Sequence, residues 1–181
     1  MGDLVIRNVE PGRDAAVCAA IYAPFVLSGP TSFEEVAPDE REMADRIARL
    51  TATHPWLVAE RDGALVGYAY ACGHRARPAY RWSTDVSVYV DEQSRRLGIG
   101  RRLYGELLDR LRSQGFRIAC AGITLPNEAS VVLHERLGFA AVGVYRKIGW
   151  KAGAWRDVGW WQLDLSPEMD EPTEPSPPSA T

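Results

Sequence analysis

The stretch from residue 82 to residue 114 restricts the possible folds of this chain more than any other feature. Residues 82–90 alternate in polarity and are rich in β-branched side chains, which is typical of a half-buried strand. Residues 100–114 carry leucines at helical spacing and predict an amphipathic helix. A strand, a short glycine-containing loop and a helix in succession indicate a mixed α/β domain built around a sheet.

Further strand and helix signals alternate on both sides of this unit. The turn signal Asp62-Gly63 joins two of the predicted strands as a hairpin. Predicted strands cover residues 4–8, 56–61, 65–72, 117–125, 140–148 and 158–165, and predicted helices cover residues 14–27, 38–53 and 127–137. We therefore predict one α/β domain over residues 1–165 with one central sheet.

The segment 166–181 differs in composition from the rest of the chain. It holds five prolines and four acidic residues, with no basic residue and few apolar side chains, so we predict a disordered tail. The formal net charge of −3 for all 181 residues rests on these acids. The folded part is therefore close to neutral and lacks the basic surplus that nucleic-acid binding usually needs.

The cysteines and histidines of the chain are few and scattered. Cys18, Cys72 and Cys120 are far apart and odd in number, which predicts neither a disulfide framework nor a metal site and favours a reducing cytoplasm. No apolar run approaches the roughly 18 residues that a membrane span needs. We expect a cytoplasmic protein without a metal, whose partner is a small molecule rather than a membrane or a nucleic acid.

The loop Arg95-Arg96-Leu97-Gly98-Ile99-Gly100 between the strand and the helix can form a cradle for an anion. Glycine lets a ligand approach the backbone, and the helix that follows turns free N–H groups and its positive dipole end toward the loop. The arginines add positive charge, so a diphosphate fits. The spacing alone equally permits a glycine-rich turn with solvated arginines, and it is neither a P-loop nor a dinucleotide-binding fingerprint.

Arginine and two glycines in the spacing Arg-x-x-Gly-x-Gly after a strand resemble the acetyl-coenzyme A signature of the GNAT N-acetyltransferases. Further motifs, spread from about residue 4 to residue 165, resemble the phosphinothricin acetyltransferase branch of that family. They include Ser32-Phe33-Glu34, Gly67-Tyr68-Ala69-Tyr70-Ala71, Val88-Tyr89-Val90, Leu125-Pro126-Asn127 and Leu133-His134-Glu135. The resemblance implies a GNAT fold, in which helices flank one central, mostly antiparallel sheet whose strands splay apart.

The same resemblance implies where acetyl-coenzyme A binds. Backbone groups of Val88 and Val90 would pair with the pantetheine arm, and backbone N–H groups of the loop would hold the pyrophosphate. Asn127, with Ser130 on the same helix face, would contact the coenzyme, the alternative for Asn127 being helix capping alone. The loop residues implied are Arg95, Arg96, Leu97, Gly98, Ile99, Gly100 and Arg101.

Asp85 is the candidate base. Amide formation from a thioester needs a neutral amine, so a group that removes the ammonium proton raises the reactive fraction. Alternation places Asp85, Ser87 and Tyr89 on one face of the strand and Val86, Val88 and Val90 on the other. The strand pattern alone favours a solvated or salt-bridged aspartate, whereas the resemblance favours a base. The family usually has glutamate here, and the shorter aspartate leaves room for a bridging water.

His134 is the second catalytic candidate. It shares a helix face with Asn127 and Ser130, opposite the apolar side, a pattern that also describes the wet side of an ordinary helix. In GNAT enzymes at large a tyrosine at this position is credited with protonating the departing thiolate, and the phosphinothricin branch has histidine. The sequence supports direct proton transfer by His134 and a purely structural role for it equally.

A basic cluster of Arg75, Arg77 and Arg81 precedes the Asp85 strand. A guanidinium fork suits carboxylates and phosphinates, so the cluster favours an acidic or zwitterionic amine over a polycationic aminoglycoside. The resemblance implies that Arg75, Arg77 and Tyr80 line the acceptor site. The alternative is an exposed basic loop.

Two further residues bear on the choice of substrate. The resemblance implies that Phe33 reaches over the acceptor site. Thr124 stands where the family has glycine, and we expect its added side chain to lie against the acceptor. The substitution puts the substrate preference in doubt more than acetyl transfer itself.

These features predict an enzyme that moves acetyl from acetyl-coenzyme A to the α-amino group of a small acidic amino-acid analogue, such as phosphinothricin or methionine sulfone or sulfoximine. Attack is expected to be direct, in a ternary complex, because no cysteine lies in a nucleophile motif. The alternatives are a GNAT enzyme for another amine (a different amino acid, a polyamine or a protein N-terminus) and a non-catalytic coenzyme A sensor. The resemblance also implies a homodimer.

Overall fold

Seven strands form one sheet in the computed structural model, which describes residues 3–166 and 171–179. The strand order is β1-β2-β3-β4-β5-β7-β6, and every neighbouring pair is antiparallel except β4 and β5. The strands are β1 (Leu4–Asn8), β2 (Trp56–Arg61), β3 (Ala64–Gly73), β4 (Ser83–Val90), β5 (Ile118–Leu125), β6 (Ala140–Lys151) and β7 (Ala154–Asp164). The predicted fold class, with a mostly antiparallel central sheet, is confirmed.

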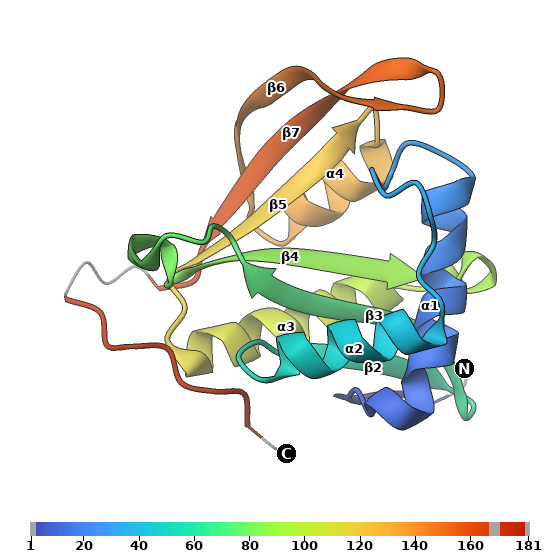
Figure 1. The fold of residues 1–181 in the computed structure, drawn as a ribbon. Coiled ribbons are helices and arrows are strands. Elements are labelled where there is room, and N and C mark those ends of the chain that lie inside the picture. The colour runs from blue at the N-terminus through green and yellow to red at the C-terminus, as the bar shows by residue number, and fades with distance from the viewer. Residues whose placement is uncertain (1–2, 167–170, 180–181) are drawn as a thin grey trace.

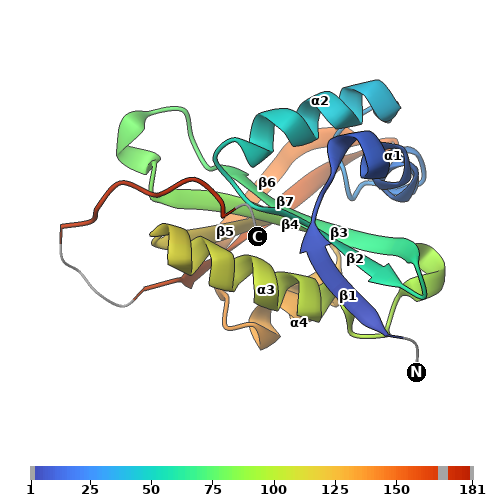
Figure 2. The same ribbon diagram turned by 90° about the horizontal axis from the view of Figure 1, so that it is seen from below.

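Four helices cover the two faces of the sheet. They are α1 (Pro11–Leu27), α2 (Glu40–Thr51), α3 (Ile99–Gln114) and α4 (Glu128–Arg136). Figure 2 shows α1 and α2 on one face and α3 and α4 on the other. Two 3₁₀ helices, Pro78–Tyr80 and Glu92–Ser94, lie in the connections on either side of β4.

Each face of the sheet has its own apolar core. The leucines that predicted an amphipathic helix, among them Leu103, Leu107 and Leu111, are buried under α3 against the sheet. On the opposite face, Tyr22 of α1 and Ile47 of α2 pack against β2 and β3. Burial of apolar surface on both faces holds the sheet between two helical layers.

The sheet splays between β4 and β5. These parallel strands pair only at Ser83 with Ile118, Thr84 with Ala119 and Asp85 with Cys120. Beyond Asp85, β4 continues beside β3 and β5 continues beside β7, so the two strands diverge as a V (Figure 1). The chain leaves the open end of the V for the N-terminal ends of α3 and α4, as the predicted splay requires.

The predicted elements are found, with differences at their ends. Strands 4–8 and 56–61 coincide with β1 and β2. Helix α1 begins at Pro11, three residues before the predicted start. Proline suits this position because it has no backbone N–H, and an N–H in the first helical turn would have no carbonyl partner inside the helix. The β6–β7 hairpin extends to a turn at Ala152 and Gly153, both at positive φ, and is longer than predicted.

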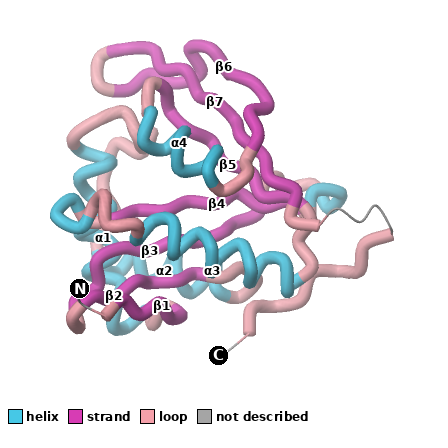
Figure 3. The backbone as a smooth tube through the Cα atoms, turned by 180° about the vertical axis from the view of Figure 1, so that it is seen from behind, coloured by secondary structure: helices cyan, strands magenta, loops and turns pink. Residues whose placement is uncertain are grey.

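The described part of the C-terminal segment has no regular secondary structure and runs beside the C-terminal end of α3 (Figure 3). The indole of Trp82 donates to the carbonyl of Thr173 at 2.8 Å. Gln114 exchanges hydrogen bonds with Ser176, one from its side-chain amide at 2.6 Å and one to its backbone carbonyl at 2.8 Å. The expectation of disorder for 166–181 stays a prediction, and residues 167–170, 180 and 181 lie outside the described residues.

No helix in the described ranges is both long enough and apolar enough to cross a lipid bilayer. The longest, α1, contains a proline at position 24 and packs its buried face onto the sheet.

Candidate active site

The backbone of the loop before α3 has a conformation compatible with the predicted anion cradle. Arg96 and Gly98 have positive φ angles of 65° and 78°, which turn the backbone sharply before the helix. The first hydrogen bond of α3 runs from the N–H of Arg102 to the carbonyl of Gly98, at 3.1 Å. The N–H groups of the preceding turn have no acceptor inside the helix and are available to an anion.

Side chains around the loop fix its position. Ile99 is buried under α3, so its backbone N–H rather than its side chain can face a ligand. The guanidinium of Arg95 lies 5.2 Å from the ring of Phe25 in α1 and 3.5 Å from the carboxylate of Glu92. Leu97 is exposed at the turn. The loop is thereby anchored to the sheet and to α1 while its backbone remains open to solvent.

The strand edge beside the loop suits an extended ligand. From Val86 to Val90, β4 pairs with β3 on one edge only, and its other edge lines the opening of the V. A Cβ added at Gly100 would lie 3.6 Å from the side chain of Leu133 and 3.8 Å from those of Val88 and Val90. The start of α3 therefore packs directly against the edge that the pantetheine arm is expected to follow.

A cavity of about 80 Å³ lies inside the V, between β4 and β5. It brings together five of the predicted site residues: Val88, Thr124, Asn127, Ser130 and His134. Tyr104 of α3, which the sequence did not single out, also lines it. The edges of the two strands form its remaining walls.

His134 is buried rather than on the wet side of α4. Its Nδ1 donates to the carbonyl of Ser130 at 2.7 Å, so its Nε2 is left to accept from the hydroxyl of Tyr104 at 3.1 Å. Burial lowers the pKa of His134, and the hydrogen bond to Ser130 opposes this shift. Asn127 caps α4 through its side-chain oxygen, which accepts from the N–H of Ser130 at 3.2 Å. The geometry describes a neutral imidazole whose single N–H is already used.

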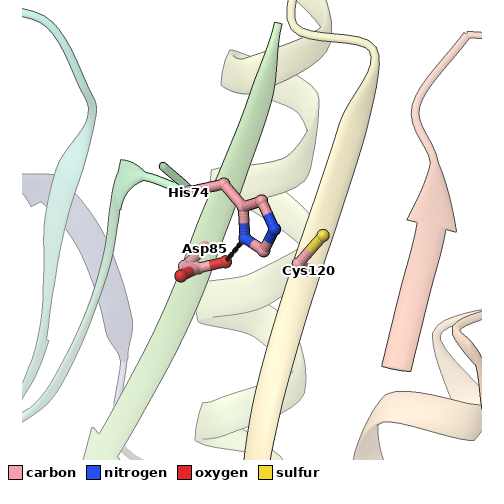
Figure 4. Close-up of side chains that lie close together, drawn as sticks. All are labelled: His74, Asp85 and Cys120. Carbon is pink, nitrogen blue, oxygen red and sulfur yellow. Dashed lines mark hydrogen bonds and ion pairs between the residues drawn. The ribbon is translucent and has the colours of Figure 1, made fainter. Parts of the chain in front are cut away.

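Asp85 lies at the apex of the V, in the last residue pair that joins β4 to β5. The predicted alternation is confirmed, since Val86, Val88 and Val90 belong to the core under α3 and Tyr89 to the core under α1. A hydrogen bond of 2.6 Å joins the Asp85 carboxylate to Nδ1 of His74, and Figure 4 shows the two groups facing each other. Burial raises the pKa of Asp85, while the hydrogen bond and the charges of His74 and Arg75 oppose the shift.

The predicted acceptor residues on the β3–β4 connection separate into two groups. The guanidinium of Arg75 lies 5.8 Å from the ring of Trp160, and the ring of Tyr80 lies 6.0 Å from that of His74. Arg77 immediately precedes the 3₁₀ helix that carries Tyr80 and is exposed. Arg81 instead stacks on Trp82 and pairs with Glu174, so it faces the C-terminal segment.

Phe33 and Thr124 hold the connection between α1 and α2 over the open end of the V. The ring of Phe33 packs against the backbone of Gly149 in β6, where an added Cβ would come within 2.2 Å of it. The Thr124 hydroxyl donates to the carbonyl of Thr31 at 3.4 Å. Glu34 is held by both terminal nitrogens of Arg46, each at 2.8 Å. The Ser32-Phe33-Glu34 motif thus has a packing reason as well as a place near the site.

His74, Asp85 and Cys120 are the described group that comes nearest to a set of metal ligands, with their donor atoms within 4.8 Å of one another. In a tetrahedral zinc site with bonds of about 2.1 Å, ligand atoms lie about 3.4 Å apart. The 2.6 Å between Nδ1 of His74 and the carboxylate of Asp85 is a hydrogen-bond distance instead. The arrangement fits an imidazole oriented by a carboxylate better than two ligands of one ion.

The three cysteines are free thiols. Burial raises the pKa of Cys18 to about 12 and those of Cys72 and Cys120 to about 11, with the nearby carboxylate of Asp85 adding to the last two shifts. A thiol is nucleophilic as its thiolate, so these cysteines are poor nucleophiles near neutral pH.

Sequence reasoning missed His74, Tyr104 and Trp160. His74 directly follows β3, whose residues Cys72 and Gly73 pair with Asp85 and Thr84 of β4. The pairing of these two strands, had it been predicted, would have placed His74 near Asp85. Tyr104 carries no signal in the sequence beyond its neighbours in an amphipathic helix. Trp160 faces the site only because β7 lies beside β5, which a linear pattern does not reveal.

Comparison with known proteins agrees with this geometry. Residues 6–160 match the family described as acetyltransferase (GNAT) domain. The chain is 42% identical over 173 residues to the phosphinothricin N-acetyltransferase of Streptomyces viridochromogenes, covering 96% of this chain and 93% of that protein. It is 36% identical over 163 residues to an L-amino acid N-acyltransferase of Escherichia coli, covering 90% and 92%.

A solved structure matches closely as well. It is the GNAT superfamily phosphinothricin acetyltransferase of Sinorhizobium meliloti in complex with acetyl-coenzyme A, with a TM-score of 0.90, 36% identity and 94% of each chain covered. The family resemblance that the sequence motifs predicted is therefore confirmed. This chain belongs to the GNAT family of acetyltransferases.

Proposed function

We propose that this protein transfers acetyl from acetyl-coenzyme A to the α-amino group of a small acidic amino-acid analogue such as phosphinothricin or methionine sulfone or sulfoximine. The observation that carries the proposal is the V between β4 and β5, which runs from the anion cradle at its open end to Asp85 at its apex. The names of the relatives, which include methionine sulfoximine and sulfone acetyltransferases, support this acceptor class.

The coenzyme would lie along the open edge of β4. Backbone N–H groups from Arg95 to Arg101 would hold the pyrophosphate at the start of α3. Val88 and Val90 would pair with the pantetheine arm as a further strand would. Asn127 and Ser130, which line the cavity, would contact the coenzyme near its reactive end.

The acceptor would bind on the face of the sheet that carries Asp85. Arg75, with Arg77 beside it, offers guanidinium donors to a carboxylate or phosphinate, and Tyr80 closes the same side. Phe33, in the connection between α1 and α2, and Thr124, in β5, would bound the acceptor site. A cationic mouth of this kind favours an amine that also carries an acidic group.

The amine would attack the thioester directly, since no thiol of the chain is activated as a nucleophile. Asp85 supplies the carboxylate that removal of the ammonium proton requires. The N–H of His134 is engaged by Ser130, so we assign His134 the positioning of the Tyr104 hydroxyl in the cavity rather than direct protonation of the thiolate.

Steady-state kinetics over a panel of amines, with free thiol as the readout, test this proposal. We expect phosphinothricin and methionine sulfone or sulfoximine to have the highest kcat/KM, and polyamines and aminoglycosides to be poor acceptors. If these analogues show no turnover while another amine does, the acceptor class is wrong. The similarity to an L-amino acid N-acyltransferase makes other free amino acids the second candidate class.

We also propose that the protein is a cytoplasmic homodimer. Large apolar side chains are exposed along the β6–β7 hairpin, and β6 is an edge strand of the sheet. They are Val142, Val144, Tyr145, Ile148, Trp150 and Trp155. Several exposed apolar side chains on a hairpin with an open strand edge suit a second copy of the chain. Sedimentation at micromolar concentration should give a dimer, and a monomer there would refute the proposal.

A further inference from the structure

The pair formed by His74 and Asp85 lies at the apex of the V between β4 and β5. We propose that His74 is the catalytic base, which takes the proton from the acceptor amine through Nε2 while Asp85 orients its ring. This inference rests on the proposed acetyl transfer and replaces Asp85 as the group that touches the amine. Asp85 then acts through His74.

The hydrogen bond fixes which nitrogen carries the proton. An ionised carboxylate only accepts, so the 2.6 Å contact with Asp85 places the proton of a neutral imidazole on Nδ1. Nε2 then presents its lone pair. In the described ranges no hydrogen bond engages Nε2, which Figure 4 shows turned toward β5 and Cys120. An oriented imidazole with a free Nε2 has the form of a general base.

Aromatic neighbours hold the ring in this orientation. The imidazole meets Tyr80 and Trp160 edge-on, at 6.0 and 5.8 Å between ring centroids. The titratable groups around it are Asp85 on β4, Cys120 on β5, and Arg75 and Tyr80 on the β3–β4 connection. The residue is mostly buried yet retains some exposure, as a group that meets a substrate must.

The position of Arg75 explains how an amino acid would present its amine. Its guanidinium lies over Trp160, the same ring that His74 contacts. An α-amino acid carries its carboxylate and its amine on one carbon, so a carboxylate held by Arg75 keeps the amine on the same side. The side chain of Asp85 is short, and the imidazole of His74, hydrogen-bonded to it at 2.6 Å, extends its reach toward an acceptor.

The proposed step conserves protons and electrons. Nε2 takes one proton from the ammonium group, and the freed lone pair of nitrogen forms the C–N bond to the thioester carbonyl carbon. The C–S bond then breaks, and the sulfur keeps its electron pair. The nitrogen loses its second proton as the amide forms, and the thiolate takes up one proton to become the free thiol. The imidazolium returns its proton to solvent.

The test uses variants of the full chain that keep the fold. His74→Asn retains an N–H that can donate to Asp85 but has no base, whereas Asp85→Asn removes the carboxylate. His54→Asn is the matched control, because His54 stacks on Phe116 and hydrogen-bonds to Thr53, neither of which is a predicted site residue. Each variant is checked by Tm and by its Kd for acetyl-coenzyme A before kcat/KM is measured from pH 5.5 to pH 9.5.

We expect His74→Asn to lower kcat/KM at pH 7 by about 100-fold or more, within the range of general-base effects. Wild-type kcat/KM should fall toward acid pH, as it does for a reaction that needs a free base, and the variant should lose this acid limb. A variant that combines His74→Asn with Asp85→Asn should lower kcat/KM little more than His74→Asn alone, because the effects of residues that act as a unit are not additive. The control and all values of Kd should stay within about threefold of wild type.

Three results would overturn the inference. His74→Asn could retain wild-type kcat/KM while Asp85→Asn abolishes it, which would make Asp85 the base. The acid limb could persist in His74→Asn. Activity could be lost with EDTA and restored by Zn²⁺, which would make His74, Asp85 and Cys120 metal ligands. Failure of the wild-type protein to acetylate any amine would instead refute the proposed function.

Discussion

Phe33 owes its position to the absence of a side chain at Gly149. A Cβ at that glycine would lie 2.2 Å from the Phe33 ring, too close for both to stay in place. We predict that Gly149→Ala displaces Phe33 and raises KM for the acceptor several-fold, with an unchanged Kd for acetyl-coenzyme A. Gly143→Ala, on the same strand with nothing within 4 Å, is the control. Equal KM values for the two variants would show that Phe33 does not bound the acceptor site.

The hydroxyl of Tyr104 satisfies a buried nitrogen of His134. Tyr104→Phe removes only the hydroxyl and leaves Nε2 of His134 without its donor. An unsatisfied buried polar atom costs about 1–3 kcal/mol, so we predict a loss of that order in the free energy of unfolding together with a lower kcat. Denaturant unfolding and steady-state kinetics measure the two effects. Tyr145→Phe, on the exposed hairpin, should change neither.

Burial of His134 makes the stability of the protein depend on pH. Its pKa is lowered in the folded state, so the unfolded chain takes up the proton first as pH falls below about 6.5. We predict that the free energy of unfolding decreases from pH 7.5 to pH 5.5. The decrease should be shallower in His134→Gln, measured by urea unfolding at each pH. An equally steep decrease in the variant would assign the effect to other groups, such as His54, whose pKa burial also lowers.

For single residues, the sequence predicted which side chains belong to the candidate site better than it predicted which side chains they contact. Asp85 and His134 could be singled out because each stands at a defined place in a strand or a helix. The contact between His74 and Asp85 depends on the path of the β3–β4 connection, and that between Tyr104 and His134 on the packing of α3 against α4. Such contacts form only once the elements have docked.

The first turn of α3 depends on the conformation of Gly98. Its φ of 78° disfavours any residue with a Cβ, by about 1–2 kcal/mol. We predict that Gly98→Ala distorts the cradle and raises the Kd for acetyl-coenzyme A about tenfold, as measured by calorimetry. Gly105→Ala within α3 meets nothing within 4 Å and should instead stabilise the helix by about 0.5–1 kcal/mol without changing this Kd. An unchanged Kd in Gly98→Ala would contradict the assigned role of the loop.

Elements with strong local patterns were predicted almost to their ends. Strands β1 and β2 have alternating or continuous apolar side chains bounded by turn residues, and they were placed correctly. The hairpin of β6 and β7 was predicted too short, because the glycines, lysine and alanines around its tip carry little strand signal. Pairing with the neighbouring strand extends it there. Tertiary pairing decided these ends, and local propensity did not.

At the scale of the whole molecule, two sub-sheets meet at only three residue pairs between β4 and β5. The sequence predicts that one sheet exists, since both helical layers need an apolar face to cover. The strand order, with β7 between β5 and β6, follows from contacts between distant segments and had no signature in the local patterns. The splay itself was expected only from the family resemblance.

The C-terminal segment contributes contacts to the whole domain. A chain truncated after Ser166 loses the hydrogen bonds that Trp82 and Gln114 make with Thr173 and Ser176. We predict a Tm lower by several degrees, at about 2–4 °C per kcal/mol for a chain of this size, with kcat unchanged. Truncation after Pro178 keeps these bonds and is the control. An unchanged Tm in the shorter chain would show that the segment does not dock in solution.

Release of free coenzyme A thiol from acetyl-coenzyme A, followed together with formation of the N-acetyl product, tests the central claim most directly. With the purified wild-type chain and phosphinothricin, we predict that thiol and N-acetylphosphinothricin appear in equal amounts at a rate that saturates with both substrates. Tight binding of acetyl-coenzyme A without thiol release for any amine of the panel would contradict the claim and describe a coenzyme A sensor instead.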